Sequence, residues 1–374
     1  MNVPVQHLVG RYPSKEQLTL KGIWGGGLYE EEELPYLNRG WCWKTLLLSD
    51  QGEGSWFDIA TSRAAATPED SVRQLTGETA VEQDTDDAPL DDRLKEHATA
   101  QEQLQIIQLD VSRLLLDPIF TVPEVQNDMV EILRQYMLES GRPYKQGFHE
   151  LCGMFYMQLY RNGYRDGIQH TTLHMFKEFI AEVAVTFYDE GNLIEWTKNT
   201  FEPILRHALP GLYEQLLMHH ELDNSIWLIR WSRLLFLREF ELEYTLCLWD
   251  HLLTFRYPVS QLVAAIIVVC LTLIVQELHS CEDHGDLMSI LLHYPSSKLL
   301  SAPQMIRSAR TLLDLWLAEQ YEDMQLICDS LIKSHNGAWF GRMQAAADGG
   351  HRLRLEERLK RRVGERIRRH HSVR

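Results

Sequence analysis

The sequence predicts an all-α fold, and three features lead to that prediction. From Leu104 onward, apolar residues recur at the spacing of amphipathic helices. No segment alternates apolar and polar residues over the length of a strand, and no Asn-Gly pair lies between two such segments as in a β-hairpin. No repeat of roughly 20–50 residues is visible, which argues against a solenoid. The 374 residues, 45% of them hydrophobic, suffice for one large domain or two ordinary ones.

The amino-terminal part contains one predicted helix and one segment of different composition. The sequence "RGWCWKTLLL", from Arg39 to Leu48, predicts a short helix. From Ile59 to Glu102 the chain is rich in Ala, Thr, Asp and Glu and contains no Phe, Trp or Tyr. Such a segment buries too little apolar area to offset its conformational entropy. We therefore expect a disordered acidic insert at 59–102.

Three later segments predict helices through periodicity or capping. Two of them place apolar residues on one face, namely Met175, Phe176, Phe179, Ile180, Val183 and Phe187 in the first and Leu242, Leu246, Trp249 and Leu253 in the second. The third begins with a capping box, because Gln304 follows Ser301 by three positions and Pro303 lies in the first turn. The apolar side of this helix consists of Ile306, Ala309, Leu313 and Trp316.

The most apolar run, "LVAAIIVVCLTLIVQEL", begins at Leu262 and loses its apolar character near Val275. It is shorter than the roughly 20 residues that span a bilayer, so it predicts a buried core helix, with a transmembrane helix as the alternative. The amino terminus shows no basic segment followed by an apolar run, so we expect no signal peptide. None of the six cysteines forms a CxxC pair or a Cys/His finger spacing, which indicates a reducing compartment and a cytoplasmic location.

Charge is unevenly distributed along the chain. The formal net charge is −16, yet the last 24 residues contain ten Lys and Arg against three Glu. An acidic body argues against binding of nucleic acid. The tail, 341–374, places Leu355, Leu359, Val363 and Ile367 at helical spacing among arginines. This pattern fits a solvated, frayed extension, and it also fits a basic amphipathic helix that attaches peripherally to an anionic endomembrane or to an acidic partner.

Familiar enzyme motifs are missing from the sequence. It contains no GxxxxGK[ST] phosphate loop, no GxGxxG and no GxSxG elbow. The segment "FHEL" starts an HExxH zinc motif at His149, but the second His would have to stand where Gly153 is. We therefore expect no metal and no cofactor bound by this chain.

Two polar clusters remain as candidates for chemistry. The first, "IQLDVSR", places Ile107, Asp110 and Arg113 three residues apart, so on a helix Asp110 can hold Arg113. The second, "YKQGFHE", contains Tyr144, Gln146, Gly147 and Glu150 in front of an apolar run. Taken alone, Arg113 fits a surface ion pair and Gln146 fits a polar cap at a helix start.

These two clusters fit IxxDxxR and YxQGxxE, and in this order they resemble the signature motifs of the TBC (Tre/Bub/Cdc) domain, a family of Rab GTPase-activating proteins. The segment "RGWCWKTLL" resembles the opening helix of that family, and "WLIRWSRLLFLREFELEYTLCLWDHLL" resembles a later helix pair. The resemblance implies a multi-helix domain of two helical subdomains over 1–340, interrupted by the acidic insert at 59–102 and followed by the basic tail.

The resemblance also implies roles for individual residues. Arg113 corresponds to the arginine finger and Gln146 to the glutamine finger, both supplied in trans to a GTP-bound Rab. Asp110 would orient Arg113, and Gly147 would let the backbone pass close to the partner or bend into the helix. Support of the loop and its helix would come from Ile107, Tyr144 and Glu150. GTP and Mg²⁺ would be bound by the Rab, so the chain would act as a catalytic activator in vesicle trafficking without a turnover site of its own.

Two departures from the family pattern accompany the match. The family usually has Thr after the finger arginine and Pro two positions further on, whereas Leu114, Leu115 and Leu116 stand here. The family prefers Met-Asn after Gln-Gly, whereas this chain has Phe148 and His149. These changes keep a second function open, that of a catalytically weak or inactive module serving as a Rab-binding or membrane-coat scaffold.

Overall fold

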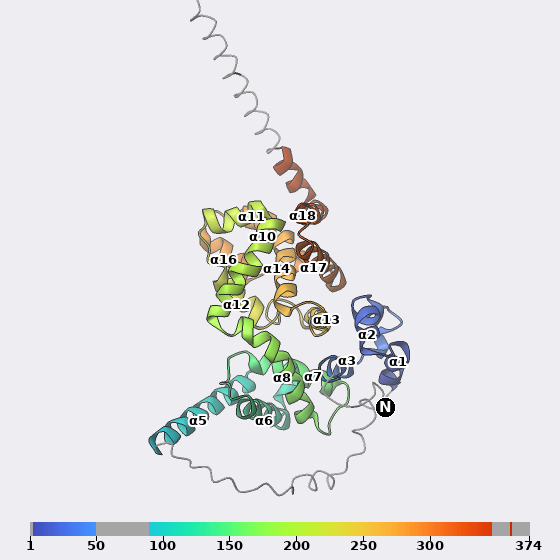
Figure 1. The fold of residues 1–374 in the computed structure, drawn as a ribbon, viewed down its shortest axis with the longest axis vertical. Helices are drawn as coiled ribbons and strands as arrows, with labels where there is room; N and C mark the ends of the chain where they lie inside the picture. The colour runs from blue at the N-terminus through green and yellow to red at the C-terminus, as the bar shows by residue number, and fades with distance from the viewer. Residues whose placement is uncertain (1–2, 50–89, 346–359, 361–374) are drawn as a thin grey trace, which may run out of the picture. The chain divides into compact units, whose positions relative to one another are not determined.

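The computed structural model describes residues 3–49, 90–345 and 360, with only the backbone described over 90–100 (Figure 1). The described residues form helices and loops without a strand, and the chain divides into two compact units. The first unit comprises Met1–Trp196 and Leu228–Ser260, and the second comprises Thr197–Trp227 and Gln261–Arg374. The predicted all-α fold with two helical subdomains is thereby confirmed.

The first unit is built from longer α-helices joined by short helical turns. Its helices are α1 (Val3–Arg11), α2 (Lys15–Gln17), α3 (Arg39–Leu48), α5 (Leu90–Ser112), α6 (Pro123–Ser140), α7 (Phe148–Arg161), α8 (Ile168–Phe187), α9 (Glu190–Trp196) and α13 (Leu242–Leu252). Its π- and 3₁₀-helical turns are η1 (Leu18–Ile23), η2 (Gly27–Tyr29), η3 (Leu34–Tyr36) and η4 (Pro118–Thr121). Helix α12 (Asn224–Arg233) begins in the second unit and ends in the first.

The second unit contains the remaining helices. They are α10 (Glu202–Ala208), α11 (Pro210–Glu214), α14 (Val259–Leu273, with its first two residues in the first unit), α15 (Val275–His279), α16 (His284–Leu292), α17 (Ala302–Leu317) and α18 (Tyr321–His335), with the short elements η5 (Thr197–Phe201), η6 (Gln215–His219) and η7 (Ser296–Lys298). Helix α14 is the predicted buried helix, because every residue from Leu262 to Ile274 is buried. No helix in the described part of the chain is both long and apolar enough to cross a bilayer. The predicted capping box at Ser301 and Gln304 opens α17.

Helix α3 starts where predicted because its first turn is capped and closely packed. The side chain of Asn38 accepts a hydrogen bond from the backbone N–H of Trp41 at 2.9 Å. The backbone N–H of Gly40 donates to Asn162 at 2.8 Å, and a Cβ atom at Gly40 would lie 2.9 Å from the carbonyl oxygen of Gln158. Only glycine permits this approach of α3 to α7.

Aromatic side chains form the core of the first unit. The ring of Trp249 lies 5.9 Å from Trp43, 5.8 Å from Phe155 and 5.0 Å from Phe179, so four helices meet in one cluster. Phe179 belongs to the predicted apolar face of α8, all of which is buried. Packing of large aromatic groups of this kind supplies much of the hydrophobic stabilisation of a domain.

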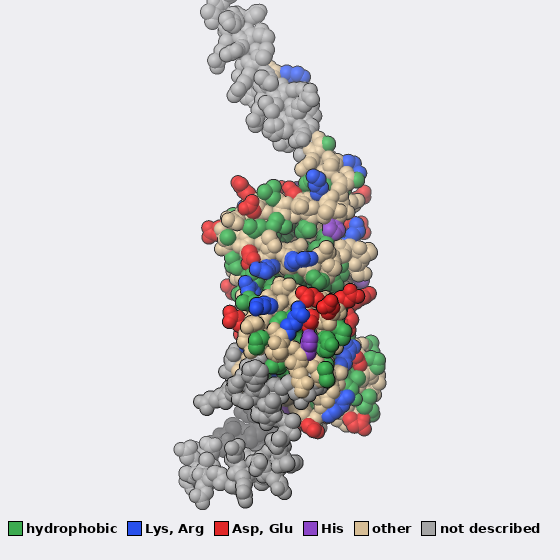
Figure 2. Space-filling model, turned by 90° about the vertical axis from the view of Figure 1, so that its right-hand side faces the viewer, with side chains coloured by type: hydrophobic (Ala, Val, Ile, Leu, Met, Phe, Trp, Pro, Cys, Tyr) green, Lys and Arg blue, Asp and Glu red, His purple; other side chains and the backbone are tan. Residues whose placement is uncertain are grey.

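The predicted acidic insert was expected at 59–102. Residues 59–89 lie outside the part of the chain that the structure describes, whereas 90–102 are helical and form the start of α5. The segment "LDDRLKEHATAQEQ" (90–103) consists largely of good helix formers, and it continues into the apolar part of α5. The tail falls outside the described residues from 346 onward, except for Lys360. Asp and Glu side chains gather in clusters on the face drawn in Figure 2, in keeping with the net charge of −16.

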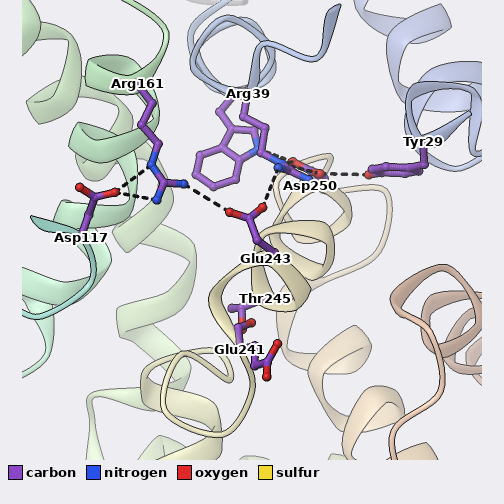
Figure 3. Close-up of polar contacts among 9 residues, drawn as sticks. Tyr29, Arg39, Asp117, Arg161, Glu241, Glu243, Thr245 and Asp250 are labelled. Carbon is purple, nitrogen blue, oxygen red and sulfur yellow. Dashed lines mark hydrogen bonds and ion pairs between the residues drawn. The ribbon is translucent and has the colours of Figure 1, made fainter. Parts of the chain in front are cut away.

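A buried carboxylate joins α3 to α13 in the first unit (Figure 3). Asp250 is 2% exposed and accepts hydrogen bonds from Tyr29 at 3.1 Å, from Arg39 Nε at 3.0 and 3.1 Å, and from the Trp43 indole at 2.7 Å. Glu243 lies on the outside of the same group, 3.7 Å from Arg39. Asp250 is therefore the carboxylate that neutralises Arg39 inside the protein.

We expect Asp250→Asn to lower the free energy of unfolding by about 3 kcal/mol, because it leaves the largely buried Arg39 without its buried counter-charge. Glu243→Gln is the matched control, since it removes an exposed partner of Arg39 and should cost less than about 0.5 kcal/mol. Urea unfolding monitored by tryptophan fluorescence measures both variants. Equal small losses in the two variants would contradict this role of Asp250.

Candidate functional site

Arg113 follows the end of α5 and projects from the surface. Helix α5 ends at Ser112, and the backbone N–H of Arg113 donates to the carbonyl of Asp110 at 3.1 Å, which closes a tight last turn. The side chain of Arg113 is exposed, and within the described residues no ion pair involves it. The contact expected between Asp110 and Arg113 is not made among the described residues, because the helix ends before Arg113 and Asp110 pairs with Tyr144.

Asp110 instead holds the loop between α6 and α7. Its carboxylate accepts a hydrogen bond from the hydroxyl of Tyr144 at 2.8 Å. The backbone N–H of Tyr144 donates to the side chain of Gln103, also on α5, at 3.0 Å. The ring of Tyr144 is buried, whereas Lys145 and Gln146 directly after it are exposed. Two bonds to α5 therefore fix the segment that presents Gln146.

Gly147 gives Gln146 its position at the start of α7. Its φ of +102° is unfavourable for other residues, and a Cβ atom there would lie 2.9 Å from both Leu234 Cδ2 and the hydroxyl of Tyr188. The bend into the helix expected of this glycine is therefore present, whereas its close approach to a partner stays a prediction. The chain turns here from the exposed Gln146 into a helix whose first twelve residues are buried.

We expect Gly147→Ala to lower the free energy of unfolding by about 2–3 kcal/mol, since it adds both backbone strain and crowding. Gly141→Ala is the matched control. Gly141 also has a positive φ, +62°, but a Cβ atom there would have no neighbour within 4 Å. Gly141→Ala should therefore lower the free energy of unfolding by about 1 kcal/mol, through backbone strain alone. Thermal unfolding of the two variants measures the difference, and equal costs would exclude crowding at Gly147.

His149 and Tyr144 form a hydrogen-bonded pair next to Asp110. Burial and the neighbouring Asp110 raise the pKa of Tyr144, so its hydroxyl keeps the proton that it donates to Asp110. The same hydroxyl lies 2.7 Å from Nδ1 of His149, so Nδ1–H of His149 is the donor in that contact. Burial lowers the pKa of His149, although Glu150 and Asp110 oppose the shift. A neutral imidazole protonated at Nδ1 satisfies this geometry.

Glu150, in the first turn of α7, pairs with an arginine from a distant segment. Arg238 donates to Glu150 through Nη2 at 2.5 Å and through Nε at 3.3 Å. Glu150 is buried, and its bond to Arg238 is what raises the pKa of Arg238 most. This two-point ion pair fixes the start of α7 against the segment that precedes α13.

Arg113 and Gln146 line the same surface pocket, of about 410 Å³. Its lining consists of Asp110, Arg113, Leu114, Leu115, Leu116, Gln146, His149, Glu150, Leu237 and Arg238. Gln146 also lines a second pocket of about 410 Å³ together with Lys145, Tyr188, Asp189, Glu190, Gly191 and Arg233. Of the predicted site residues, Tyr144 and Gly147 are buried and line neither pocket, and Ile107 is fully buried on the inner side of α5. Four of the predicted candidates, Asp110, Arg113, Gln146 and Glu150, therefore line one pocket.

The three leucines after Arg113 run between two anchors. Leu114 and Leu116 face Gly153 of α7, where a Cβ atom would meet them at 3.0 and 3.3 Å. Asp117 accepts hydrogen bonds from Arg161 at 2.6 and 2.9 Å, as Figure 3 shows. Leu115, between them, is 92% exposed. The departure from the usual family pattern therefore leaves an ordered segment with one outward leucine.

Arg238 and His149 are site residues that the motifs did not single out. Arg238 could have been noticed as a charge inside the apolar run "LLFLREF", where an arginine needs a partner. No pattern in the sequence predicts that His149 forms a hydrogen bond with Tyr144. The described residues hold no group of three His, Cys, Asp or Glu that could bind a metal ion.

Comparison with known proteins defines the class of this fold and site. The family model of the Rab-GTPase-TBC domain matches residues 38–279, more than half of the chain. The chain belongs to this family, as its sequence motifs predict. The comparison with curated proteins gives no match.

Two solved structures resemble the chain. The crystal structure of the Ypt/Rab-GAP domain of Gyp1p aligns with a TM-score of 0.60 and 15% identity, over 84% of this chain and 100% of that chain. The crystal structure of the Chlamydomonas flagellar RabGAP TBC domain aligns with a TM-score of 0.45 and 14% identity, over 80% of this chain and 96% of that chain. The first of these supports the assignment of the fold.

Proposed function

We propose that this chain stimulates GTP hydrolysis by a Rab-family GTPase, with Arg113 and Gln146 acting together on the nucleotide of the GTPase. One observation carries the proposal. The two residues come from separate segments, yet both are exposed and line one pocket. Membership in the Rab-GTPase-TBC family supports a Rab as the partner.

The two side chains match the two needs of GTP hydrolysis. In the transition state, negative charge spreads over the γ-phosphoryl oxygens, and the attacking water must be oriented. Arg113 supplies a permanent positive charge with a planar fork of donors that fits phosphate oxygens. Gln146 supplies an amide that can both donate to and accept from a water molecule. A Glu at this position would repel the phosphates, and a Lys would lack the acceptor.

The surroundings of Gln146 support its use as a preorganised group. Tyr144 ties the loop to α5, Gly147 sets the turn, and the Glu150–Arg238 pair fixes the helix that follows. Because these supports are buried or ion-paired, the loop that carries Gln146 is already ordered, and binding of the partner costs little conformational entropy there. Arg113 has freedom to reach outward, since its side chain leaves from the end of α5.

GTP and Mg²⁺ would be bound by the Rab, and this chain would complete that active site from outside. The activator would thereby set the lifetime of a GTP-bound Rab in vesicle trafficking on the cytoplasmic side of a membrane. Attachment of the basic tail to anionic lipid belongs to the same proposal. It predicts salt-sensitive binding to anionic vesicles that truncation at residue 350 abolishes.

A hydrolysis screen tests the proposal. Purified Rab-family GTPases loaded with GTP are mixed with the full chain, and phosphate release is followed under single-turnover conditions. At least one Rab should hydrolyse GTP about 10³-fold faster or more, in the range that arginine fingers supply. Binding to GTP-loaded Rabs without acceleration of any of them would overturn the proposal and favour the scaffold function.

A further inference from the structure

We infer that Ile106, Leu109 and Leu115, three exposed apolar side chains around Arg113, form a docking surface for the GTP-loaded GTPase. This surface is called the apolar rim below. The inference rests on the proposed function and deepens it, because it names the kind of partner surface the site takes. That surface is an apolar patch bordering the bound nucleotide.

The placement of Ile106 and Leu109 follows from the helix α5. Gln103 and Asp110 both form hydrogen bonds with Tyr144. Ile106 follows Gln103 by three residues and precedes Asp110 by four, so it lies on the same flank of α5, which faces the Gln146 loop. Leu109 follows Ile106 at a step of three on the same helix, and Arg113 follows directly after the helix ends at Ser112. Ile106 and Leu109 are 49% and 48% exposed, whereas the opposite flank of α5 packs inward through Ile107 and Val111.

Leu115 extends the rim beyond the end of the helix. Its exposure does not come from a loose segment, because Leu114 packs on Gly153 and Asp117 bonds to Arg161 on either side of it. It lines the pocket that contains Arg113 and Gln146. An isolated exposed leucine is ordinary on a protein surface. Three large apolar side chains within ten residues, next to an arginine that has no ion pair with any described residue, indicate a contact surface.

The partner is the occupant that this geometry favours. Arg113 can reach a nucleotide only if the protein holding that nucleotide lies against the same flank of α5, so the rim is continuous with the proposed contact. Segments of a GTPase around the γ-phosphate become ordered in the GTP-bound state. A contact with such segments would let the rim select GTP-loaded partners before hydrolysis. Partners with a polar residue at this place would bind more weakly.

The rim and Arg113 should affect different kinetic constants. The rim contacts a part of the GTPase that does not change during the reaction, so it contributes equally to the ground state and the transition state. Its loss should therefore raise KM and leave kcat nearly unchanged. Loss of Arg113 should lower kcat.

The experiment compares Leu115→Ser, Leu115→Met and the double variant I106S/L109S with the unaltered full chain. The GTPase is the one that the unaltered protein stimulates most in the Rab panel. Leu115→Ser and the double variant should each raise KM about tenfold with kcat within a factor of two, and Leu115→Met should restore KM. Leu326→Ser is the control, because Leu326 is 63% exposed on α18, belongs to the second unit and lines neither pocket. Circular dichroism and thermal unfolding check that all variants are folded.

Three results would overturn the inference. An unchanged KM in Leu115→Ser, or an equal rise in Leu326→Ser, would show that the rim does not contact the partner. A lower KM in the rim variants would mean that another part of this chain, such as 50–89, or a second copy covers the rim. Absence of stimulation by the unaltered protein with every Rab would overturn the proposed function itself, so the two failures are distinguishable.

Discussion

Replacement of Arg113 by Ala is expected to reduce the stimulated rate of GTP hydrolysis by about 10³-fold or more. Arg113 is the arginine of the pocket that has no ion pair with any described residue, so its positive charge is available to the γ-phosphate. The variant removes this charge. Arg238, the other arginine in the pocket, is committed to Glu150. Because Arg113 is exposed, its loss should leave the thermal unfolding temperature within about 1 °C of the unaltered protein. Single-turnover phosphate release measures the rate.

Two further variants sharpen this expectation. Arg113→Lys keeps the charge but loses the planar fork, so its rate should fall between those of the Ala variant and the unaltered protein. Arg134→Ala is the matched control, since Arg134 is a surface arginine paired with Glu131 on α6 and lines neither pocket at the site. Its rate should be unchanged. If Arg113→Ala keeps more than a tenth of the stimulation, Arg113 is not the arginine finger.

Replacement of Gln146 by Ala should reduce the stimulated rate by about 10²–10³-fold, in line with the removal of one oriented hydrogen-bonding group at a transition state. The loop should keep its shape, because Tyr144 and Gly147 hold it without help from the exposed Gln146 side chain. The loss should therefore appear in kcat, with the affinity for the GTP-loaded Rab changed by less than about threefold. Stopped-flow phosphate release and a binding titration measure the two quantities.

Gln146→Glu tests whether the amide group matters or only the length of the side chain. It keeps the length of the side chain but removes the donor and adds a negative charge near the phosphates, so it should be at least as inactive as Gln146→Ala. Gln135→Ala, on the outer face of α6 where Gln135 bonds to Glu139, is the control and should retain full activity. Activity of Gln146→Glu near that of the unaltered protein would contradict a role for the amide group.

Local sequence patterns were sufficient for several of the longer helices. Helix α3 spans the predicted Arg39–Leu48, and α14 and α17 lie where an apolar run and a capping box predict them. These elements are specified within a few residues, by periodicity and by caps. The segment 90–102 lacks apolar periodicity, so the pattern predicts a helix only from Leu104 onward, in the second half of α5.

The site was only partly predictable. The motifs located Arg113 and Gln146, and the structure places both on one pocket. The partner of Asp110 was not predictable, since it depends on α5 ending at Ser112 and on Tyr144 being carried to it by a separate loop. The same is true of the Glu150–Arg238 and Asp117–Arg161 pairs, whose members are far apart in the sequence. Tertiary contacts of this kind leave no local pattern.

Capture of the Rab in its GDP–aluminium fluoride form tests most directly whether Arg113 and Gln146 act on one nucleotide. The fluoride group imitates the phosphoryl group in flight, so a stable complex forms only when the groups that stabilise the transition state are present. The unaltered chain should form a complex that depends on fluoride and survives gel filtration, whereas Arg113→Ala and Gln146→Ala should each abolish it while binding to the GTP-loaded Rab persists. A fluoride-dependent complex of normal stability with both variants would contradict the assignment of these two residues.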